Sequence, residues 1–474
     1  MGKLVRNTIF VVGGQTFTKI ISFFSVPIIA RLLGTEWFGI YTLSFSFVML
    51  FSGIADFGIE NLTIRDISRD SSKLEKYLFN SLVVRFFIAL IIYFLIILSA
   101  KFLGYSEQIF QLIAILGMLI FANFLINTLN AFVISLEKMG ISSLVLMIQN
   151  IINPCTALIM LLLNYSVKNI FFAIIALNFV LSLIYLFVAC RSVLRIKLKI
   201  DFALCKYLLI NGLPFALVSI FGYVYIYNVV IIISKFAPIA DVGIFNAAFK
   251  LMLSLTFIPT SLIIVFFPSI ARKSIDTVKT YLKESTENAI RALFLIAFPL
   301  AITYSLLSKQ IINTLFDIEF SNAAPVLAVL GWAMLFFFLS APLTLVIINS
   351  KHVKKFVVLF LIITITSLVT NTLIVSFFGY YGASWSFFLL EICRFILYFI
   401  FIKRYLKLNI DLTGVIKTPL LLGIPTALFI LALGYAGLNL VIILLLSFVF
   451  YLLSLILAKE YIFISLLKKA FKIH

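Results

Sequence analysis

Charge is scarce in this chain of 474 residues, and Lys and Arg outnumber Asp and Glu by 37 to 18. Charged residues make up 12% of the sequence and hydrophobic residues 64%, whereas a soluble domain is about 25% charged and about 45–50% apolar. The composition therefore excludes a water-soluble globular protein. It also excludes intrinsic disorder, because disordered chains are poor in aromatic residues and this one holds 52 Phe.

Cysteine and histidine are also rare, with four Cys and two His. The four Cys form no Cys-x-x-Cys pair, so neither a metal cluster nor a disulfide framework is indicated. No polar stretch is long enough for a soluble nucleotide-binding domain. We predict that the chain is not an enzyme, that it holds no metal or cofactor, and that any energy comes from an ion gradient, the membrane potential or the substrate's own gradient.

Long apolar runs, such as 81–100 and 441–458, are abundant. A spanning helix needs about 20 mostly apolar residues, and the runs are too long and unbroken for the alternating strands of a barrel. We predict an all-α polytopic membrane protein with about 14 transmembrane helices. The expected spans are 7–32, 38–62, 79–102, 109–136, 141–164, 169–190, 207–234, 241–268, 288–308, 325–349, 355–378, 381–402, 416–436 and 438–458. Because Lys19 interrupts the first run, we interpret residues 1–30 as a span and not as a cleaved signal.

The basic residues are distributed unevenly between the two sides of these spans. One set of alternate loops, with both termini, carries most of the Lys and Arg, and three cations are assigned within spans. The other side carries only Arg31, Lys101, Lys168, Lys235 and Lys309. Since basic loops stay in the cytoplasm, we predict that both termini are cytoplasmic. We expect the protein to lie in the inner membrane of the cell. The topology explains the net charge of +19 without nucleic acid as a partner.

A weak internal repeat appears when the chain is shifted by 204 residues. The shift aligns Asn7 with Asn211, Arg31 with Lys235, and Gly39 with Gly243. Both aligned segments join the first two helices of a six-helix set on the same side of the membrane, which is typical of parallel repeats. We therefore predict two six-helix lobes in parallel pseudo-two-fold repeat, residues 1–203 and 204–408, followed at 409–474 by an additional helix pair and a cytoplasmic tail.

Three cations, Lys19, Lys250 and Arg394, are predicted inside spans. A charge at the bilayer centre costs about 2.5–3.5 kcal/mol on insertion scales, which makes each a candidate for function. Lys19 lies midway between Arg6 and Arg31, too deep for its side chain to reach water. It contacts either an anionic substrate or a buried carboxylate, and the sequence leaves both open.

Acidic residues in the spans have two readings. Glu391 and Arg394 are spaced i, i+3 and can pair on one helical face, and a proton- or cation-coupling role for Glu391 is the alternative. Asp56 and Glu60, spaced i, i+4, are either a helix-end pair facing water or ligands for a metal with a phosphorylated lipid. Because these acids sit at helix ends or pair with a neighbour, the cations within the spans favour an anionic head group as substrate.

Short motifs carry a resemblance to a known family. The segment Ala30–Tyr41 (ARLLGTEWFGIY), the run Asp56–Glu60 (DFGIE) and the segment Asp241–Asn246 (DVGIFN), followed by Lys250, are the residues concerned. They resemble the polysaccharide-transporter branch of the multidrug/oligosaccharidyl-lipid/polysaccharide (MOP) exporter superfamily, which includes the Wzx O-antigen flippases. Size, helix count and the two-lobe repeat extend the resemblance over nearly the whole chain, although family members often have 12 spans.

The resemblance implies a flippase that moves an undecaprenyl-diphosphate-linked oligosaccharide repeat unit of O-antigen, capsule or exopolysaccharide from the cytoplasmic to the outer leaflet. It implies substrate contacts from Lys19, Lys250, Arg31 and Arg394, and ion coupling by Asp56, Glu60 or Glu391. The implied partners are membrane lipids, a polysaccharide polymerase and a chain-length regulator. An ion-coupled multidrug antiporter and a lipid II flippase are alternatives within the superfamily, and a scaffold or synthase subunit without transport is a third.

Overall fold

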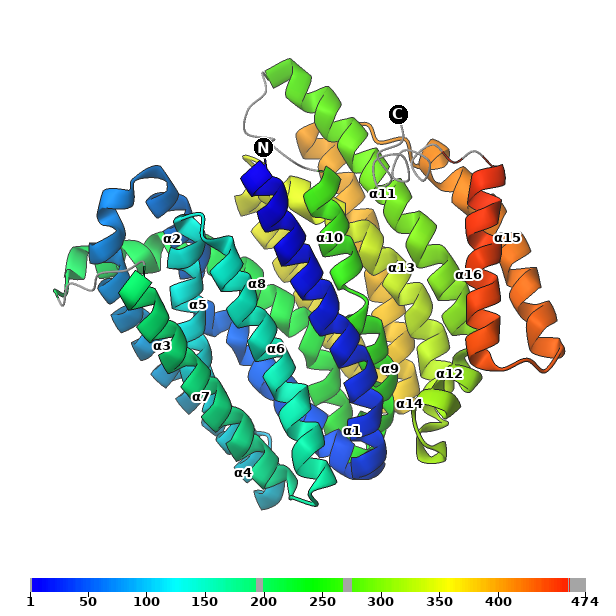
Figure 1. The fold of residues 1–474 in the computed structure, drawn as a ribbon, viewed down its shortest axis with the longest axis horizontal. Helices are drawn as coiled ribbons and strands as arrows, with labels where there is room; N and C mark the ends of the chain where they lie inside the picture. Colours follow the sequence, from blue (N-terminus) through cyan, green and yellow to red (C-terminus); the bar gives the residue numbers. More distant parts are fainter. Residues whose placement is uncertain (1, 193–198, 267–274, 459, 461–474) are drawn as a thin grey trace. The chain divides into compact units, whose positions relative to one another are not determined.

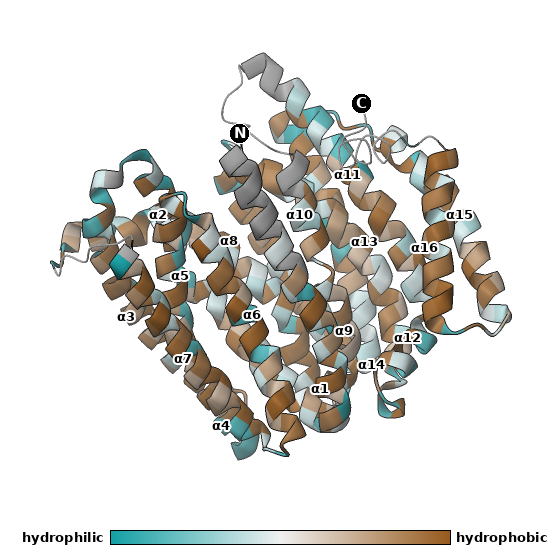
Figure 2. Ribbon diagram, viewed as in Figure 1, coloured by the Kyte–Doolittle hydropathy of each residue, from teal (hydrophilic) through white to brown (hydrophobic). Residues whose placement is uncertain are grey.

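The computed structural model describes residues 2–192, 199–266, 275–458 and 460, and they fold into helices joined by short turns (Figure 1). No strand occurs among these residues, so the predicted all-α class is confirmed. Apolar residues cover much of the helix surfaces, and polar residues gather near helix ends and turns (Figure 2). The predicted cytoplasmic tail beyond residue 460 lies outside the described residues.

The chain divides into two compact units. The first comprises Met1–Asn246 and Val357–Gly379. Its helices are α1 (Gly2–Asp56), α2 (Ile59–Arg69), α3 (Leu74–Phe102), α4 (Glu107–Gly117), α5 (Leu119–Ser135), α6 (Met139–Leu162), α7 (Val167–Ser192), α8 (Phe202–Phe236), the start of α9 (Ile239–Ser254) and part of α14 (Val353–Phe401). Helix α3 is typical: Phe87 and Phe94 are 59% and 64% exposed, as expected for side chains that face lipid.

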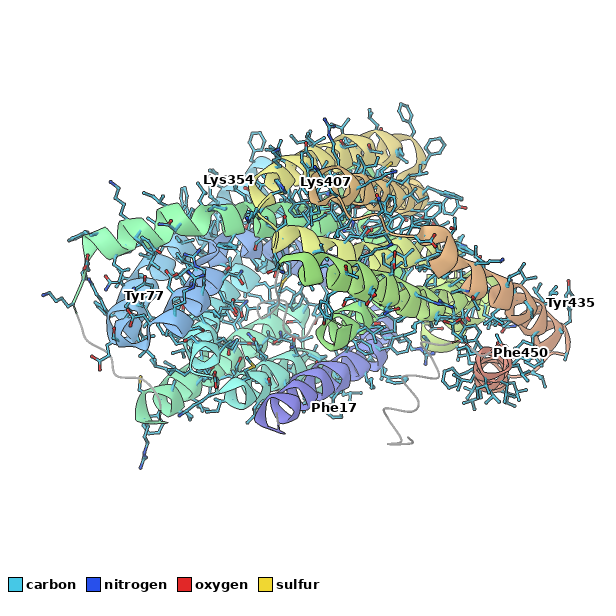
Figure 3. All side chains as sticks on the ribbon, turned by 90° about the horizontal axis from the view of Figure 1, so that it is seen from above. Phe17, Tyr77, Lys354, Lys407, Tyr435 and Phe450 are labelled. Carbon is cyan, nitrogen blue, oxygen red and sulfur yellow. The ribbon has the colours of Figure 1, made fainter. Side chains whose placement is uncertain are left out.

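The second unit comprises Ala247–Phe356 and Tyr380–His474. It contains the rest of α9 and α14 together with α10 (Phe257–Phe266), α11 (Ile275–Leu306), α12 (Ser308–Leu315), α13 (Ala323–Ile348), α15 (Leu412–Tyr435) and α16 (Leu440–Leu457). The Tyr451 hydroxyl donates to the Leu295 carbonyl at 2.7 Å, which ties α16 to α11. Helices α15 and α16 contact one another through Phe429 and Phe450 (Figure 3), whose rings stack with their centroids 4.3 Å apart.

Twelve helical segments among the described residues are long and apolar enough to cross a membrane, so the chain is a multi-pass membrane protein. Two of them, Phe17–Arg69 and Val353–Leu406, exceed 50 residues. At about 1.5 Å per residue each is more than twice the thickness of the hydrocarbon layer. Non-helical backbone interrupts them at Gly34 (φ 71°) and Gly379 (φ 57°). Fourteen spans stays a prediction, which requires each of these two segments to cross twice.

Boundaries differ from the expected spans in several places, of which two show the physical reason. Helix α11 begins at Ile275, well before the predicted start at residue 288, because its first turns are polar and carry no apolar run. The predicted span 241–268 is divided into α9 and α10, and its last two residues lie outside the described part of the chain. Apolar length locates a membrane crossing but does not mark where a helix continues into water or breaks within lipid.

A break in the first long segment places two carboxylates. Helix α1 ends at Asp56, and Phe57 and Gly58 both have positive φ, 48° and 67°, before α2 begins. A Cβ on Gly58 would lie 2.3 Å from the Gly212 carbonyl oxygen of α8. The close approach and the left-handed backbone both require glycine at this position. The break therefore packs directly on α8 and holds Asp56 and Glu60 on either side of the turn.

The aligned glycines of the repeat make reciprocal contacts. A Cβ on Gly39 would lie 2.2 Å from the Ile239 carbonyl oxygen, and a Cβ on Gly243 would lie 2.1 Å from the Thr35 carbonyl oxygen. Residues 35 and 239 are themselves 204 positions apart, so each repeat contacts the other through the same pair of positions. Such reciprocity characterises a contact across a two-fold axis. It supports the repeat, while the lobe boundaries 1–203 and 204–408 stay a prediction.

Asp201 stabilises the start of α8 at the edge of the first unit. Its Oδ1 accepts from the Leu204 amide at 3.0 Å, and Lys76 Nζ lies 2.5 Å from Oδ2. The hydrogen bond from Lys76, followed by that from Leu204, lowers the pKa of Asp201 below its usual 3.8. A carboxyl whose pKa is lower in the folded state contributes stability above its unfolded pKa, and this contribution is lost as the pH falls through the folded value.

We expect Asp201→Ala to lower the melting temperature by about 1–2 °C at pH 7, because one helix cap and one exposed ion pair are lost. Asp201→Asn, which retains a capping side chain, should lose less. Thermal melts in detergent from pH 7 downwards check the sign, since the difference from wild type should persist at pH 5 and shrink only below about pH 3.8. A difference that shrinks near neutral pH would contradict this assignment.

Candidate functional site

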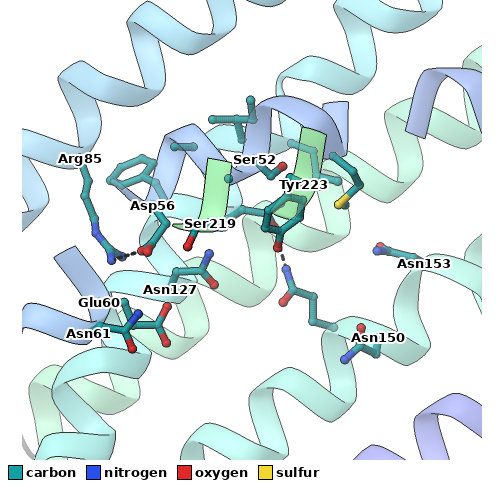
Figure 4. A pocket seen from close by; sticks show the side chains of 18 residues that line it. Ser52, Asp56, Glu60, Asn61, Arg85, Asn127, Asn150, Asn153, Ser219 and Tyr223 are labelled. Carbon is teal, nitrogen blue, oxygen red and sulfur yellow. Dashed lines mark hydrogen bonds and ion pairs between the residues drawn. The ribbon is translucent and has the colours of Figure 1, made fainter. Parts of the chain in front are cut away.

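A polar cavity of about 440 Å³ lies among the helices of the first unit (Figure 4). Helices α1, α2, α3, α5, α6 and α8 all contribute to its walls. The polar lining residues are Ser52, Asp56, Glu60, Asn61, Arg85, Asn123, Asn127, Gln149, Asn150, Asn153, Ser219 and Tyr223. Polar groups are expensive within hydrocarbon and mark substrate or ion sites when they gather there. The volume lies within the range of small-molecule sites, about 300–1,000 Å³.

A buried ion pair forms one side of the cavity. Arg85 of α3 is 1% exposed, and its Nη2 lies 2.5 Å from Asp56 Oδ1 at the end of α1. Its Nη1 donates to Thr128 Oγ1 at 3.2 Å. Figure 4 shows the guanidinium and the carboxylate pointing toward one another. Because a guanidinium cannot give up its proton in a protein, an arginine at this depth needs such a partner.

A second carboxylate, Glu60, lines the same cavity from the first turn of α2. Within the described part of the chain, Glu60 has no ion-pair partner at 4.0 Å or less. With one Arg and two carboxylates ionised, the described lining carries a net charge of −1. Since Asp56 already neutralises the single cation among these described lining residues, the cavity is poorly suited to a diphosphate and better suited to hydroxyl groups or a cation.

A chain of side-chain amides forms the opposite wall. Asn178 of α7 is fully buried, and its Nδ2 donates to Asn153 Oδ1 at 2.8 Å. Gln149 Nε2 donates to Asn123 Oδ1 at 2.8 Å and to Asn178 Oδ1 at 3.3 Å. These bonds fix the orientation of three cavity amides, and pre-organised polar groups lose less entropy when they bind a ligand.

Other cavity amides remain available. Among the residues that the structure describes, Asn61, Asn127 and Asn150 have no side-chain hydrogen bond to the protein. An amide offers both a donor and an acceptor, which matches the two roles of a sugar hydroxyl. Tyr223 adds an aromatic face that stacks on Tyr227 with ring centroids 6.1 Å apart. The cavity therefore combines hydrogen-bonding groups with an aromatic surface.

The predicted site residues are divided between the two units. Asp56 and Glu60 lie together in the cavity. Lys19 is half-buried on α1 and does not line it, and no carboxylate lies within 4.0 Å of Lys19 among the described residues. Arg31, near the break at Gly34, is exposed. The roles assigned to these four residues stay predictions.

The remaining predicted residues belong to the second unit. Lys250 is half-buried on α9. Arg394 Nη2 lies 2.5 Å from Glu391 Oε2 on α14, so the i, i+3 spacing predicted this pair correctly. The Arg394 guanidinium also lies 4.8 Å from the centroid of the Phe337 ring. No group of three or more metal-ligating side chains occurs among the residues searched.

Arg85 is not among the three cations predicted inside spans, although it lies inside the span predicted at 79–102. The same is true of Arg291 of α11, which lies inside the span predicted at 288–308 and pairs with Glu460 at 2.6 Å. The only sequence signal for a buried arginine at these two sites is position, since each arginine lies inside a predicted span. The partner carboxylates are 29 and 169 positions away, so no local spacing pointed to either pair.

The fold is shared with solved transporters at low sequence identity. A structure described as lipid II flippase MurJ in an inward closed conformation matches with a TM-score of 0.76, 13% identity, and coverage of 96% of this chain and 100% of that one. An inward-facing multidrug resistance MATE transporter of the MOP superfamily matches with a TM-score of 0.61 and 14% identity, and the match covers 85% of this chain and 96% of that one. A MOP superfamily transporter from Pyrococcus furiosus matches with a TM-score of 0.59 and 15% identity, and the match covers 84% of this chain and 94% of that one. No curated protein matches the chain.

The twelve candidate spans among the described residues and the structural matches define a multi-pass membrane protein with the fold of the MOP transporters. A family model described as "Polysaccharide biosynthesis protein" matches residues 4–274, more than half of the sequence. The chain belongs to this polysaccharide biosynthesis family. The resemblance inferred from the short motifs is thereby confirmed.

Proposed function

We propose that the chain is a flippase that moves an undecaprenyl-diphosphate-linked oligosaccharide from the cytoplasmic to the outer leaflet. The observation that carries this proposal is the amide-lined cavity of the first unit, in a chain of the polysaccharide biosynthesis family. Several sugars and a diphosphate cannot cross about 30 Å of hydrocarbon unaided. A polar cavity inside the protein would shelter the sugars while the lipid tail stays in the bilayer.

We propose different residues as contacts for the sugars and for the diphosphate of the substrate. In the first unit, Asn61, Asn127 and Asn150 would bind sugar hydroxyls, and Arg85 would remain with Asp56. Lys19, Arg31, Lys250 and Arg394 are the proposed contacts for the diphosphate or for sugars. Access would alternate between the leaflets by rocking of the predicted lobes, as is usual for transporters built from repeats. Both termini would lie in the cytoplasm of a cell whose polysaccharide polymerase and chain-length regulator use the exported unit.

A second candidate function is ion-coupled multidrug antiport. The described lining holds two carboxylates against one cation together with the aromatic face of Tyr223, which favours antiport because an organic cation pairs with carboxylates and stacks on aromatic rings. In either function Glu60, the cavity carboxylate without an ion-pair partner among the described residues, is our proposed coupling group, and Asp56 and Glu391 are the alternatives. The same experiment separates the two functions.

Deletion of the gene should leave lipid-linked repeat units on the cytoplasmic leaflet and remove the surface polymer. Extraction of the lipid-linked oligosaccharides and mass analysis of their sugars measure the first effect and identify the cargo. Re-expression of the wild-type chain should restore the polymer. Unchanged surface polymer together with greater sensitivity to cationic drugs would instead establish antiport, and accumulation of the peptidoglycan precursor alone would indicate a lipid II flippase.

A further inference from the structure

A second cavity of about 220 Å³ adjoins the first and shares one residue with it, Asn150. Helix α1 contributes Gly14 and Thr18, and α6 contributes Ser142 and Ser143 together with apolar neighbours. The whole cavity belongs to the first unit. At this volume it falls below the range of independent ligand sites, so its position beside the larger cavity points to an extension of that site.

The lining of the smaller cavity suits an uncharged sugar. Thr18 and Ser142 are each only 3% exposed, and with Ser143 they place three hydroxyl-bearing side chains in the lining. Leu146 and Met147 supply apolar contacts beside them. The described lining contains no Asp, Glu, Lys or Arg. A sugar ring has the matching chemistry, because hydroxyl groups surround it while its C–H groups form apolar faces.

Two features keep the cavity open to a ligand. Among the described residues no protein group hydrogen-bonds to the Asn150 side chain, which is exposed where the cavities meet. Among the described residues, a Cβ on Gly14 would find only Met147 Sδ nearby, at 3.7 Å, so a glycine leaves room beside Met147 at this position. Methionine is flexible and polarisable, and it adapts to ligands of different shape.

We infer that the smaller cavity is an accessory subsite for a second, uncharged sugar of the transported unit. Asn150 is the amide shared between the two sugars, and Ser143 lines the subsite. This inference rests on the proposed flippase function. It adds that the chain distinguishes substrates by the length of their sugar portion, because a lipid with a single sugar would occupy only the larger cavity.

Two probes of different length test the subsite in proteoliposomes. The short probe is undecaprenyl diphosphate carrying one N-acetylglucosamine, and the long probe carries two. A membrane-impermeant lectin that binds N-acetylglucosamine measures how much of each probe reaches the opposite leaflet. We expect Ser143→Leu, which fills the subsite, to slow transport of the long probe about tenfold and to leave the short probe unchanged. Leu144→Phe, at a position 57% exposed on the same helix, is the control for added bulk.

The outcomes separate the inference from the function on which it rests. Equal loss of both probes in Ser143→Leu, or no loss of either, overturns the subsite while wild-type transport upholds the flippase. Failure of the wild-type chain to move either probe removes both. If Ser143→Leu does not fold, Ser143→Cys can be labelled with a hydrophilic maleimide after the four native Cys are replaced by Ala. The long probe, and not the short one, should slow this labelling, and equal protection by both would again overturn the subsite.

Discussion

Arg85→Met is expected to abolish transport and to lower the free energy of unfolding by about 3–5 kcal/mol, the range found when one partner of a buried ion pair is removed. The physical reason is that the carboxyl group of Asp56, whose side chain is 18% exposed, would lose its ion-pair partner. Thr128 would also lose the donor that Arg85 supplies. Thermal melts in detergent measure the stability, and restoration of surface polymer in the deletion strain measures transport.

A double substitution separates the two effects of Arg85. Arg85→Met combined with Asp56→Leu removes both charges, so it should recover most of the lost stability, as apolar replacements of buried pairs often do. Transport should remain absent if the pair is needed in the cavity, and recovery of transport would show that the pair is structural only. Arg65→Met is the matched control, because its ion pair with Asp66 involves an arginine side chain that is 41% exposed and should contribute less than about 1 kcal/mol.

Gly39→Ala and Gly243→Ala are expected to produce the second large effect, each destabilising the fold by about 3 kcal/mol or more. Each new Cβ would lie 2.1–2.2 Å from a backbone oxygen, and overpacking that displaces backbone is at the upper end of the usual 1–3 kcal/mol. Melting temperature and the yield of folded protein in detergent measure the loss. Gly140→Ala is the control, since a Cβ there meets nothing within 4 Å.

The reciprocal contact adds a second expectation. If the two glycines lie across one pseudo-two-fold contact, Gly39→Ala and Gly243→Ala should have similar effects, and the double variant should lose less than the sum of the two single losses, because a backbone shift caused by one substitution also relieves the other. A fully additive pair, or one variant that behaves like Gly140→Ala, would contradict a shared contact. Such a result would also weaken the repeat inferred from the 204-residue shift.

The fold could be predicted largely from apolar length. Every backbone polar group within hydrocarbon must be hydrogen-bonded inside the protein, and a long apolar helix meets this requirement by itself. The runs predicted at 141–164 and 325–349 correspond to α6 (Met139–Leu162) and α13 (Ala323–Ile348) within about two residues. The connection predicted between the spans 7–32 and 38–62 contains Gly34, where the backbone is non-helical. The break at Phe57–Gly58 lies inside the predicted span 38–62 and could not be placed by apolar length. It depends on the close approach of Gly58 to Gly212, and these two residues are distant in sequence.

The candidate site was predicted only in part, since the spacing of Asp56 and Glu60 indicates a pair of carboxylates while Arg85 is absent from the predicted site residues. The amides were missed altogether. Uncharged residues such as Asn123 and Gln149 interrupt an apolar run only slightly, so hydropathy gives them little weight. Their importance lies in their mutual contacts through Asn178, which bring together α5, α6 and α7. Helical spacing within one span carries no information about such contacts.

Photocrosslinking from inside the cavity shows whether the sugars of the transported lipid enter it. A photoreactive amino acid at Asn127 should, on illumination of cells that make the polymer, capture an adduct whose mass includes the sugars of the lipid-linked unit. The same amino acid at Phe94, which is 64% exposed on α3, should capture phospholipid without sugar. If the cavity of the first unit holds the sugars, sugar-bearing adducts should form from position 127 and not from position 94. Adducts without sugar at position 127, in a variant that still supports surface polymer, would contradict it.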